Sequence, residues 1–295
     1  MDDRAALVAA VRRFNRTVTH RVGALEDRYL ARGRPLGQAR VLWEIGQAGG
    51  DLASLRARLD LDSGYLSRLL RALERDGLVA VEARGGDGRE RTAALTEAGR
   101  AEWAALDEQS NELAGGVLAA LSPKQQAELV ESMAQVERLL VASMIDIAPC
   151  DPSDAVARHC LRSYFRELSE RFSDGFDPSV ALPITEDDLT PPHGVLLVAR
   201  LHGEGVGCGA VKFHRGEPPY LKRMWVSPSV RGLGVGRRLL AELEAVSAAT
   251  GAPSVRLETN AALVEAIEMY RRAGYREVEP FNDEPYAHHW FVKDL

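Results

Sequence analysis

Cysteine is scarce in this 295-residue sequence, which contains only Cys150, Cys160 and Cys208. None of them has a histidine or a second cysteine at the spacing of a metal site, so we expect free thiols, a reducing cytoplasmic location and no metal. Apolar runs of the roughly 20 residues that span a bilayer are missing, which argues against a membrane protein. The first residues, MDDRAALVAAVRRF, begin with acids and include arginines, a pattern unlike a signal peptide.

An excess of positive charge is also lacking, because the formal net charge is −6 at pH 7. This argues against nonspecific binding of polyanions by the whole chain, although a local basic patch is still compatible with it. The hydrophobic share of 45% and the charged share of 27% are typical of a globular protein. The length allows two domains, each with its own core.

The pattern of residues changes near the middle of the chain. Residues 3 to about 147 have mostly helical periodicity, and SPKQ, with Ser122 as the N-cap and Gln125 closing a capping box, predicts a helix start. APCDPSD predicts a linker at 148–154. We therefore expect a mainly α-helical domain over 1–147 and a second domain over 155–295. Two apolar stripes mark the first domain: Leu7, Val8, Val11, Phe14 and Val18, and Leu129, Val130, Met133, Val136 and Leu140.

The second domain is predicted to be α/β, because helical and strand-like segments are mixed. Helices are expected at about 155–172, directly after the glycines of 232–236, and around 263–274. Strands are expected at 194–201, 206–213, 220–226 and 254–260, and near 275–280 and 287–295.

One predicted helix of the first domain has two very different faces. Leucines 66, 69, 70 and 73 share one face of LDSGYLSRLLRALERDGLV, and hydroxyls and guanidiniums occupy the other. Such groups contact base edges and phosphates in a major groove. The alternative is that this helix face is exposed to solvent and binds nothing. A hairpin follows, and in RGGDGRER Asp87 precedes Arg89 by two residues, so the carboxylate can hold the guanidinium at a tip that enters a minor groove.

With these features, residues 5 to about 145 resemble the MarR family of winged helix-turn-helix transcription regulators. The resemblance also rests on the LTEAG that follows the hairpin and on helices at both ends. It implies a homodimer with interleaved first and last helices that binds double-stranded operator DNA. The DNA contacts that it implies are Ser63, Tyr65, Ser67, Arg68 and Arg71, with Arg84 and Arg89 in the wing. Acidic residues slightly outnumber basic ones in 1–147, so binding has to depend on this local stripe and on low salt.

A glycine-rich turn directly before a helix, RGLGVGRRLLAELE at 231–244, is the main motif of the second domain. Backbone N–H groups of such a turn converge at the positive end of a helix dipole and form a phosphate site. The spacing is G-x-G-x-G, with Arg237 where a dinucleotide-binding fold needs its third glycine, and the Lys-Ser/Thr ending of a P-loop is absent. Arg231 and Arg237 flank the turn, which suits a pyrophosphate.

Residues 155–295 resemble the GNAT superfamily of N-acetyltransferases. The resemblance rests on the R-x-x-G-x-G turn, on LKRMWV as a strand expected to carry a bulge, and on LETN followed by MYRRAGY. It implies a mixed, mostly antiparallel sheet, acetyl-CoA as co-substrate and direct acetyl transfer to an amine. For a first strand the chain offers only MIDIA, at 144–148. The implied acetyl-CoA contacts are Met224, Trp225, Val226, Arg231, Gly232, Leu233, Gly234, Val235, Gly236, Arg237, Asn260 and Tyr270.

The same resemblance implies Tyr270 as the acid that faces the sulfur of CoA, although a core tyrosine is the alternative. The base is open, because Tyr220 stands where many relatives place a glutamate. Glu217, Glu258 and Glu284 are candidates, and Glu258 is our first choice. The cluster FNDEPYAHHW is expected to shape the acceptor pocket with Glu284, Tyr286 and His288.

The sequence thus predicts a MarR-like regulator fused to a GNAT-like acetyltransferase. Two alternatives are open: a regulator whose second domain only senses a ligand, and an acetyltransferase whose first domain is only a dimerisation scaffold.

Overall fold

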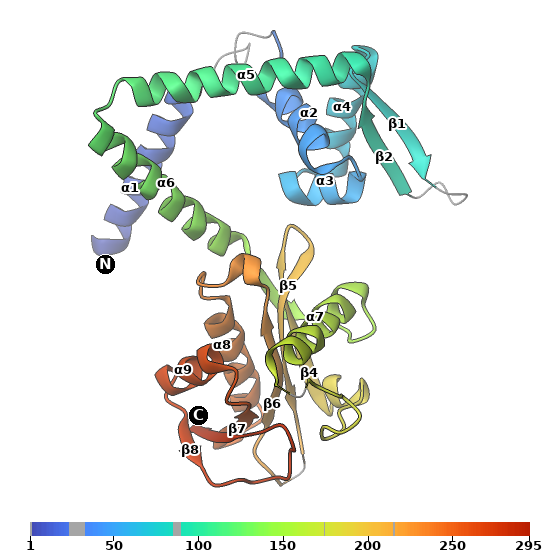
Figure 1. Cartoon of the computed structure of the whole chain (residues 1–295), viewed down its shortest axis with the longest axis vertical. Coiled ribbons are helices and arrows are strands. Elements are labelled where there is room, and N and C mark those ends of the chain that lie inside the picture. Colours follow the sequence, from blue (N-terminus) through green and yellow to red (C-terminus); the bar gives the residue numbers. More distant parts are fainter. Residues whose placement is uncertain (1, 24–32, 85–89, 174, 215) are drawn as a thin grey trace. The chain divides into compact units, whose positions relative to one another are not determined.

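The computed structural model describes residues 2–23, 33–84, 90–173, 175–214 and 216–295 (Figure 1). The chain divides into two compact units, Met1–Met133 and Ala134–Leu295. Within the described residues, no helix is long and apolar enough to cross a membrane.

The first unit is mainly helical. Its elements are α1 (Asp2–Arg21), α2 (Leu36–Ala48), α3 (Leu52–Leu59), α4 (Ser63–Arg75), β1 (Val79–Arg84), β2 (Glu90–Leu95), α5 (Glu97–Ala119) and α6 (Pro123–Met144), whose last turns belong to the second unit. The core lies where α2, α3, α4 and the hairpin meet, around Leu42, Leu55 and Leu73. The predicted capping box is confirmed, since Ser122 N donates to Gln125 Oε1 (3.0 Å) and Gln125 N to Ser122 Oγ (3.4 Å).

Helix α4 forms as the sequence predicts. The Asp62 carboxylate caps its start by accepting from Tyr65 N (2.8 Å). All four leucines of the predicted apolar face are buried. The predicted hairpin is also confirmed, because β1 and β2 pair antiparallel from Val79 opposite Leu95 to Arg84 opposite Glu90.

The apolar stripe of α1 does not enter this core. Leu7, Val8, Val11, Phe14 and Val18 are all exposed. On α6, Val130, Met133 and Leu140 are exposed as well, and Leu129 and Val136 are half-buried. A single chain therefore leaves the two predicted stripes largely open to solvent.

The second unit is built on a seven-stranded sheet in the order β3-β4-β5-β6-β7-β9-β8. The strands are β3 (Asp146–Pro149), β4 (Gly194–Leu201), β5 (Glu204–Lys212), β6 (Tyr220–Val226), β7 (Ser254–Thr259), β8 (Arg276–Val278) and β9 (His289–Asp294). Among the strand pairs of the described residues, only β6 and β7 are parallel, so the predicted mixed, mostly antiparallel sheet is confirmed. MIDIA does supply a first strand, and the first two residues of the predicted linker, Ala148 and Pro149, lie in it.

Helices cover both faces of this sheet. Alternate residues of β4 face opposite ways: Leu197 belongs to the core with α8 (Val235–Ala248) and α9 (Val264–Arg272), and Leu196 packs with α7 (Ala155–Arg171). The 3₁₀ helices Asp187–Leu189 and Pro228–Val230 complete the unit.

The sheet opens between its two parallel strands. Within the described residues, β6 and β7 have a single ladder position, Tyr220 opposite Arg256. The predicted bulge in β6 is confirmed: its register to β5 shifts opposite Gly209, and Arg223 has a left-handed φ of 59°. A split between strands and a bulge beside it leave room for groups from both faces of the sheet.

Candidate functional site

The glycine turn lies between the 3₁₀ helix at 228–230 and α8. Gly232 and Gly234 have φ of +77° and +80°, a left-handed conformation that side chains with a Cβ disfavour. Among the residues that the structure describes, the N–H groups of Gly232, Gly234, Val235 and Gly236 donate no backbone or side-chain hydrogen bond. Gly232 is exposed. The turn therefore offers free amides at the start of α8, as an anion site requires.

The two arginines of the turn differ in their surroundings. The Arg231 guanidinium is held by Glu167 of α7, with Nη2 2.7 Å from Oε1, and its Nε donates to Val226 O (3.0 Å). Arg237 is exposed, and a Cβ on Gly234 would lie 3.6 Å from its Nη2. Arg237 is therefore placed beside the turn, whereas Arg231 ties the turn to α7.

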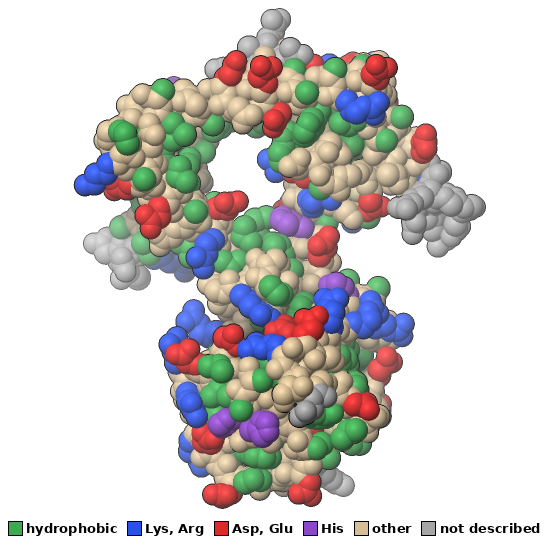
Figure 2. All heavy atoms as spheres, viewed as in Figure 1, with side chains coloured by type: hydrophobic (Ala, Val, Ile, Leu, Met, Phe, Trp, Pro, Cys, Tyr) green, Lys and Arg blue, Asp and Glu red, His purple; other side chains and the backbone are tan. Residues whose placement is uncertain are grey.

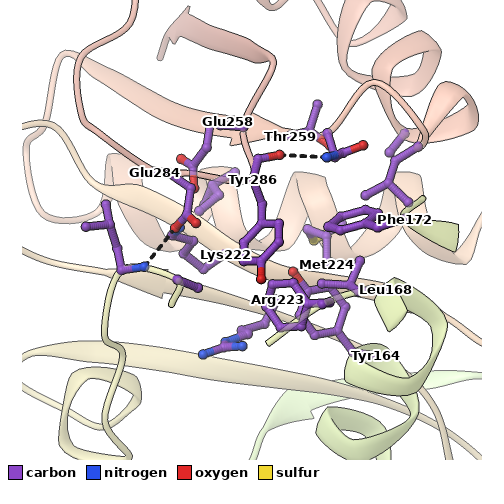
Figure 3. Close-up of a pocket in the computed structure, with 18 of the residues that line it drawn as sticks. Tyr164, Leu168, Phe172, Lys222, Arg223, Met224, Glu258, Thr259, Glu284 and Tyr286 are labelled. Carbon is purple, nitrogen blue, oxygen red and sulfur yellow. Dashed lines mark hydrogen bonds and ion pairs between the residues drawn. The ribbon is translucent and has the colours of Figure 1, made fainter. Parts of the chain in front are cut away.

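A cavity occupies the split between β6 and β7 (Figure 3). Tyr164 and Phe172 reach it from the α7 side of the sheet, and Tyr270 from α9 on the other side. Met224 at the bulge and Asn260 at the end of β7 also line it. The strand split thus brings together side chains that an unbroken sheet would keep apart.

Three charged side chains from separate segments meet in this cavity. Lys222 of β6 forms ion pairs with Glu258 of β7 and with Glu284, at 3.4 Å from Nζ to Oε2 for the latter. Exposed fractions of the side chains are 12% for Lys222, 4% for Glu258 and 7% for Glu284. Leu182 N also donates to Glu284 Oε2 (3.1 Å), which fixes that carboxylate.

Tyr270 lies in the same cavity and is almost fully buried. Burial raises its pKa, and the nearby Tyr164 and Glu258 raise it further. Its hydroxyl therefore keeps its proton at neutral pH and can act as a hydrogen-bond donor.

The loop before β9 contributes one wall of the cavity. Tyr286 stacks among Phe172 and Phe176, with ring centroids 5.8 Å and 4.8 Å away, and its hydroxyl accepts from Asp177 N (3.0 Å). Asn260 Nδ2 donates to Tyr286 O (2.7 Å) and so fixes this loop to the end of β7.

Some predicted site residues lie elsewhere. His288 is exposed, is not among the lining residues and accepts from Ala261 N (3.2 Å). Trp225 is buried on the α7 face, where its Nε1 donates to Glu167 (2.9 Å). Glu217 is about half exposed and pairs with Arg256. Of the candidate bases, the structure therefore brings Glu258 and Glu284 to the cavity, but not Glu217.

Sequence reasoning missed the aromatic wall and Lys222. Phe172 and Phe176 belong to the end of α7 and the segment after it, and nothing in their local pattern distinguishes them from core residues. Lys222 had a usable signal, because a charged residue inside a buried strand needs a partner.

The α4 face of the first unit has the predicted form. Ser63, Tyr65, Arg68 and Arg71 are exposed and Ser67 is half-buried, and Arg68 lies over the Tyr65 ring at 5.4 Å. Figure 2 shows acidic and basic side chains scattered among uncharged ones on the visible face of each unit. Arg89 lies outside the described residues, and only the backbone of Arg84 is described.

Together, these features define a winged helix-turn-helix unit followed by an α/β unit of the acyl-CoA N-acyltransferase fold. The family model of the MarR family matches residues 32–90, and that of the acetyltransferase (GNAT) domain matches residues 192–277.

Two relatives match part of the chain. An uncharacterised N-acetyltransferase of Schizosaccharomyces pombe is 32% identical over 130 residues, which are 41% of this chain and 80% of that protein. An IAA acetyltransferase of Azospirillum brasilense is 39% identical over 100 residues, which are 34% of this chain and 64% of that protein. The chain thus spans slightly less than two thirds of the second relative. Among solved structures, a GNAT-family acetyltransferase from Staphylococcus aureus is 18% identical with a TM-score of 0.41, covering 51% of this chain and 99% of that one.

The chain belongs to the GNAT acetyltransferase family, and its first part carries a MarR family domain. Both resemblances seen in the sequence are thereby confirmed.

Proposed function

We propose that this protein transfers the acetyl group of acetyl-CoA to a primary amine, and that its first unit binds operator DNA as a homodimeric transcription regulator. The observation that supports the enzymatic part is the set of free amides of Gly232, Gly234, Val235 and Gly236, beside a strand split that opens into a cavity with buried carboxylates.

The residues present fit acetyl-CoA. The free amides of the glycine turn hold the pyrophosphate with the help of Arg237, and Arg231 keeps the turn in place through Glu167. The edge of β6 that faces the split pairs with the amides of the pantetheine arm, and N–H groups around Met224 to Val226 polarise the acetyl carbonyl. Acetyl-CoA supplies the acetyl thioester. The contacts on this account are Met224, Val226, Gly232, Leu233, Gly234, Val235, Gly236, Arg237, Asn260 and Tyr270. Trp225 contributes through its backbone alone, because its side chain lies on the α7 face, and Arg231 contributes by holding the turn.

The chain's own residues handle the protons. A lysine-like amine has a pKa near 10.4, so deprotonating it at pH 7 costs about 5 kcal/mol. Glu258 takes this proton directly or through water, and Glu284 positions the amine. In the overall reaction a bond forms from the amine nitrogen to the acetyl carbon, the carbon–sulfur bond breaks, and the second proton that the nitrogen loses balances the proton that the departing sulfur gains to leave as the thiol of CoA. Tyr270 donates a hydrogen bond to the departing sulfur, because its raised pKa keeps it protonated.

A turnover assay tests the enzymatic part. The full chain is incubated with acetyl-CoA and a panel of small amines, amino acids and a lysine-containing peptide, and free CoA is measured with a thiol reagent. We expect amine-dependent release of CoA with at least one acceptor. Binding of acetyl-CoA without any release across the panel would instead favour a sensor role for the second unit.

The exposed face of α4 carries the DNA-binding part of the proposal. Its hydroxyls and guanidiniums project from a helix whose leucines are buried, as in a recognition helix. A gel shift with the DNA upstream of the coding sequence tests this part. Failure of the chain to shift that DNA at low salt would favour a first unit that serves only as a dimerisation scaffold.

A further inference from the structure

The two buried glutamates of the cavity are not fully hydrogen-bonded. Glu258 Oε1 and Glu284 Oε2 face Lys222, but Glu258 Oε2 and Glu284 Oε1 are buried and have no hydrogen-bond partner among the described residues. A buried carboxylate oxygen without a donor is unfavourable, and more so because the group is charged. Two such oxygens in one cavity call for a ligand that brings its own donors.

The cations already present do not supply these donors. Lys222 faces the other oxygen of each carboxylate, and its ammonium also lies over the Tyr220 ring at 4.6 Å. Arg223 lines the cavity too, but its guanidinium stacks on Phe165 at 4.4 Å, and within the described residues it has no ion pair with either glutamate. The Tyr220 hydroxyl flanks the cluster and accepts from Asn282 Nδ2 (2.8 Å). Burial, the charge of Glu258 and a hydrogen bond to Glu258 raise the pKa of Tyr220, so this hydroxyl serves Glu258 but not Glu284.

A metal ion does not fit this place. Within the described part of the chain no group of three or more His, Cys, Asp or Glu side chains could hold one. The Lys222 ammonium also stands between the carboxylates, where it would repel a divalent cation. A protonated amine fits better, because it carries a single charge and three N–H donors for the free oxygens.

The remaining wall defines the body of this ligand. Phe172, Phe176 and Tyr286 form one aromatic cluster at the cavity, and Leu182 and Ala181 line it as well. Aromatic faces attract a neighbouring ammonium and also cover apolar carbon. Figure 3 shows Tyr286 between the glutamates and Phe172. Carboxylates beside an aromatic wall suit an ammonium attached to an aromatic or aliphatic body.

We infer that the acceptor of this enzyme is a small amine that binds in its cationic form, with the ammonium on Glu258 Oε2 and Glu284 Oε1 and an apolar body against Phe172, Phe176 and Tyr286. This inference rests on the proposed function, and it narrows the acceptor to a class. Glu258, one of the two carboxylates that hold the ammonium, then receives its proton before the amine reacts, and Glu284 keeps the amine in place.

Calorimetric titration of the full chain without acetyl-CoA tests this inference with matched ligands. The amines are 2-phenylethylamine, tryptamine and hexylamine, each beside the alcohol of the same skeleton, and 3-phenylpropionate serves as the anion. We expect at least one amine to bind tenfold more tightly than its alcohol, and the anion not to bind. Equal affinity for amine and alcohol, no binding of any amine, or preferred binding of the anion to Arg223 would each overturn the inference.

Isosteric variants test whether Glu258 and Glu284 cause the preference for amines. Glu284→Gln and Glu258→Gln keep the side-chain shape and an oxygen for the existing contacts, so we expect intact folding, an amine affinity reduced tenfold or more, and an unchanged affinity for the alcohol. Glu186→Gln, an exposed carboxylate outside the cavity, is the matched control and should bind amines like the wild type. An unchanged amine affinity in both cavity variants would overturn the inference.

A parallel titration with acetyl-CoA keeps the two proposals separate. Acetyl-CoA binding without amine selectivity would contradict the acceptor class and leave the proposed transferase intact. Amine selectivity without acetyl-CoA binding would support the ammonium site and contradict the transferase.

Discussion

Tyr220 lies opposite Arg256 at the one described ladder position between β6 and β7. Beyond this pair the parallel strands separate, and the residues that line the cavity come from both faces of the sheet. The separation leaves the β6 edge without a neighbouring strand next to the glycine turn. A single pair of residues therefore marks where the sheet ends as a continuous layer and where the candidate site begins.

Removal of the Tyr270 hydroxyl tests its role as a donor to the departing sulfur. We expect Tyr270→Phe to lower kcat by about 100-fold, the effect of losing one positioned proton or hydrogen-bond donor, without weakening acetyl-CoA binding. Steady-state kinetics with the best acceptor measures this effect. Tyr275→Phe is the control, because the Tyr275 ring lies 5.7 Å from that of Tyr270 but does not line the cavity. Similar losses in both variants would indicate a structural role.

Arg68 and Arg71 are exposed on the recognition face of α4, and their replacement tests DNA binding. We expect Arg68→Ala combined with Arg71→Ala to weaken binding and to reduce the dependence of log K on log salt by about 0.9 for each phosphate that the variant no longer neutralises. Fluorescence anisotropy over a salt series measures both quantities. Arg158→Ala, an exposed arginine on α7, should leave them unchanged. If the double variant bound DNA as tightly as the wild type, α4 would not be part of the DNA interface.

A charged substitution in the exposed apolar stripe of α1 tests the proposed homodimer. Burying one Val or Phe side chain stabilises by about 1.5–3 kcal/mol, so an interface containing Val11 and Phe14 should not tolerate a charge. We expect Val11→Glu to shift the mass in light scattering from two chains to one. Arg13→Glu changes the charge on the same helix outside the stripe and should remain dimeric. A wild type that has the mass of one chain would contradict the dimer itself.

Asp188 gives a prediction for acid stability. Burial raises the pKa of Asp188, but the hydrogen bonds from Lys212 (2.8 Å) and Thr185 outweigh burial and hold the pKa at about 2. Because the folded value lies below the usual 3.8, the stabilisation is present above about pH 4 and is lost as the pH falls towards 2. We expect Asp188→Asn to lower stability by about 1 kcal/mol at pH 6, allowing for solvent screening.

Calorimetric melting of wild type and variant at pH 6 and pH 3 checks this pH dependence, and the gap between them should shrink at pH 3. The exposed Asp283→Asn is the control. A gap of the same size at both pH values would mean that the carboxylate charge does not stabilise the fold.

The sequence predicted elements whose residues carry strong local signals. Strands at 194–201 and 220–226 have the predicted bounds, and the helix predicted at about 155–172 ends one residue earlier. These predictions succeed because the alternation of a strand and the Asp154 cap of a helix are local signals. The bulge in LKRMWV was expected as part of the resemblance to the GNAT superfamily, and it is confirmed. Such features depend on neighbours in the chain, so one sequence is enough to place them.

The composition of the site could be predicted only in part. Glu258, Glu284, Tyr286 and Tyr270 do line one cavity, but His288 does not. The pairing of Arg231 with Glu167 was missed as well, since it joins segments far apart in the chain. Side-chain partners across a sheet depend on packing geometry, which local residue patterns do not encode.

Titration of the full chain with acetyl-CoA by calorimetry tests the central claim, that the free amides of the glycine turn hold the pyrophosphate. Gly234→Ala adds a methyl group at the turn and about 1–2 kcal/mol of backbone strain. Gly251→Ala adds the same strain at φ +81° in the turn after α8, away from the site. We predict that the wild type and Gly251→Ala bind acetyl-CoA equally, and that Gly234→Ala binds at least tenfold more weakly. No heat with the wild type, or equal binding by all three proteins, would contradict the claim.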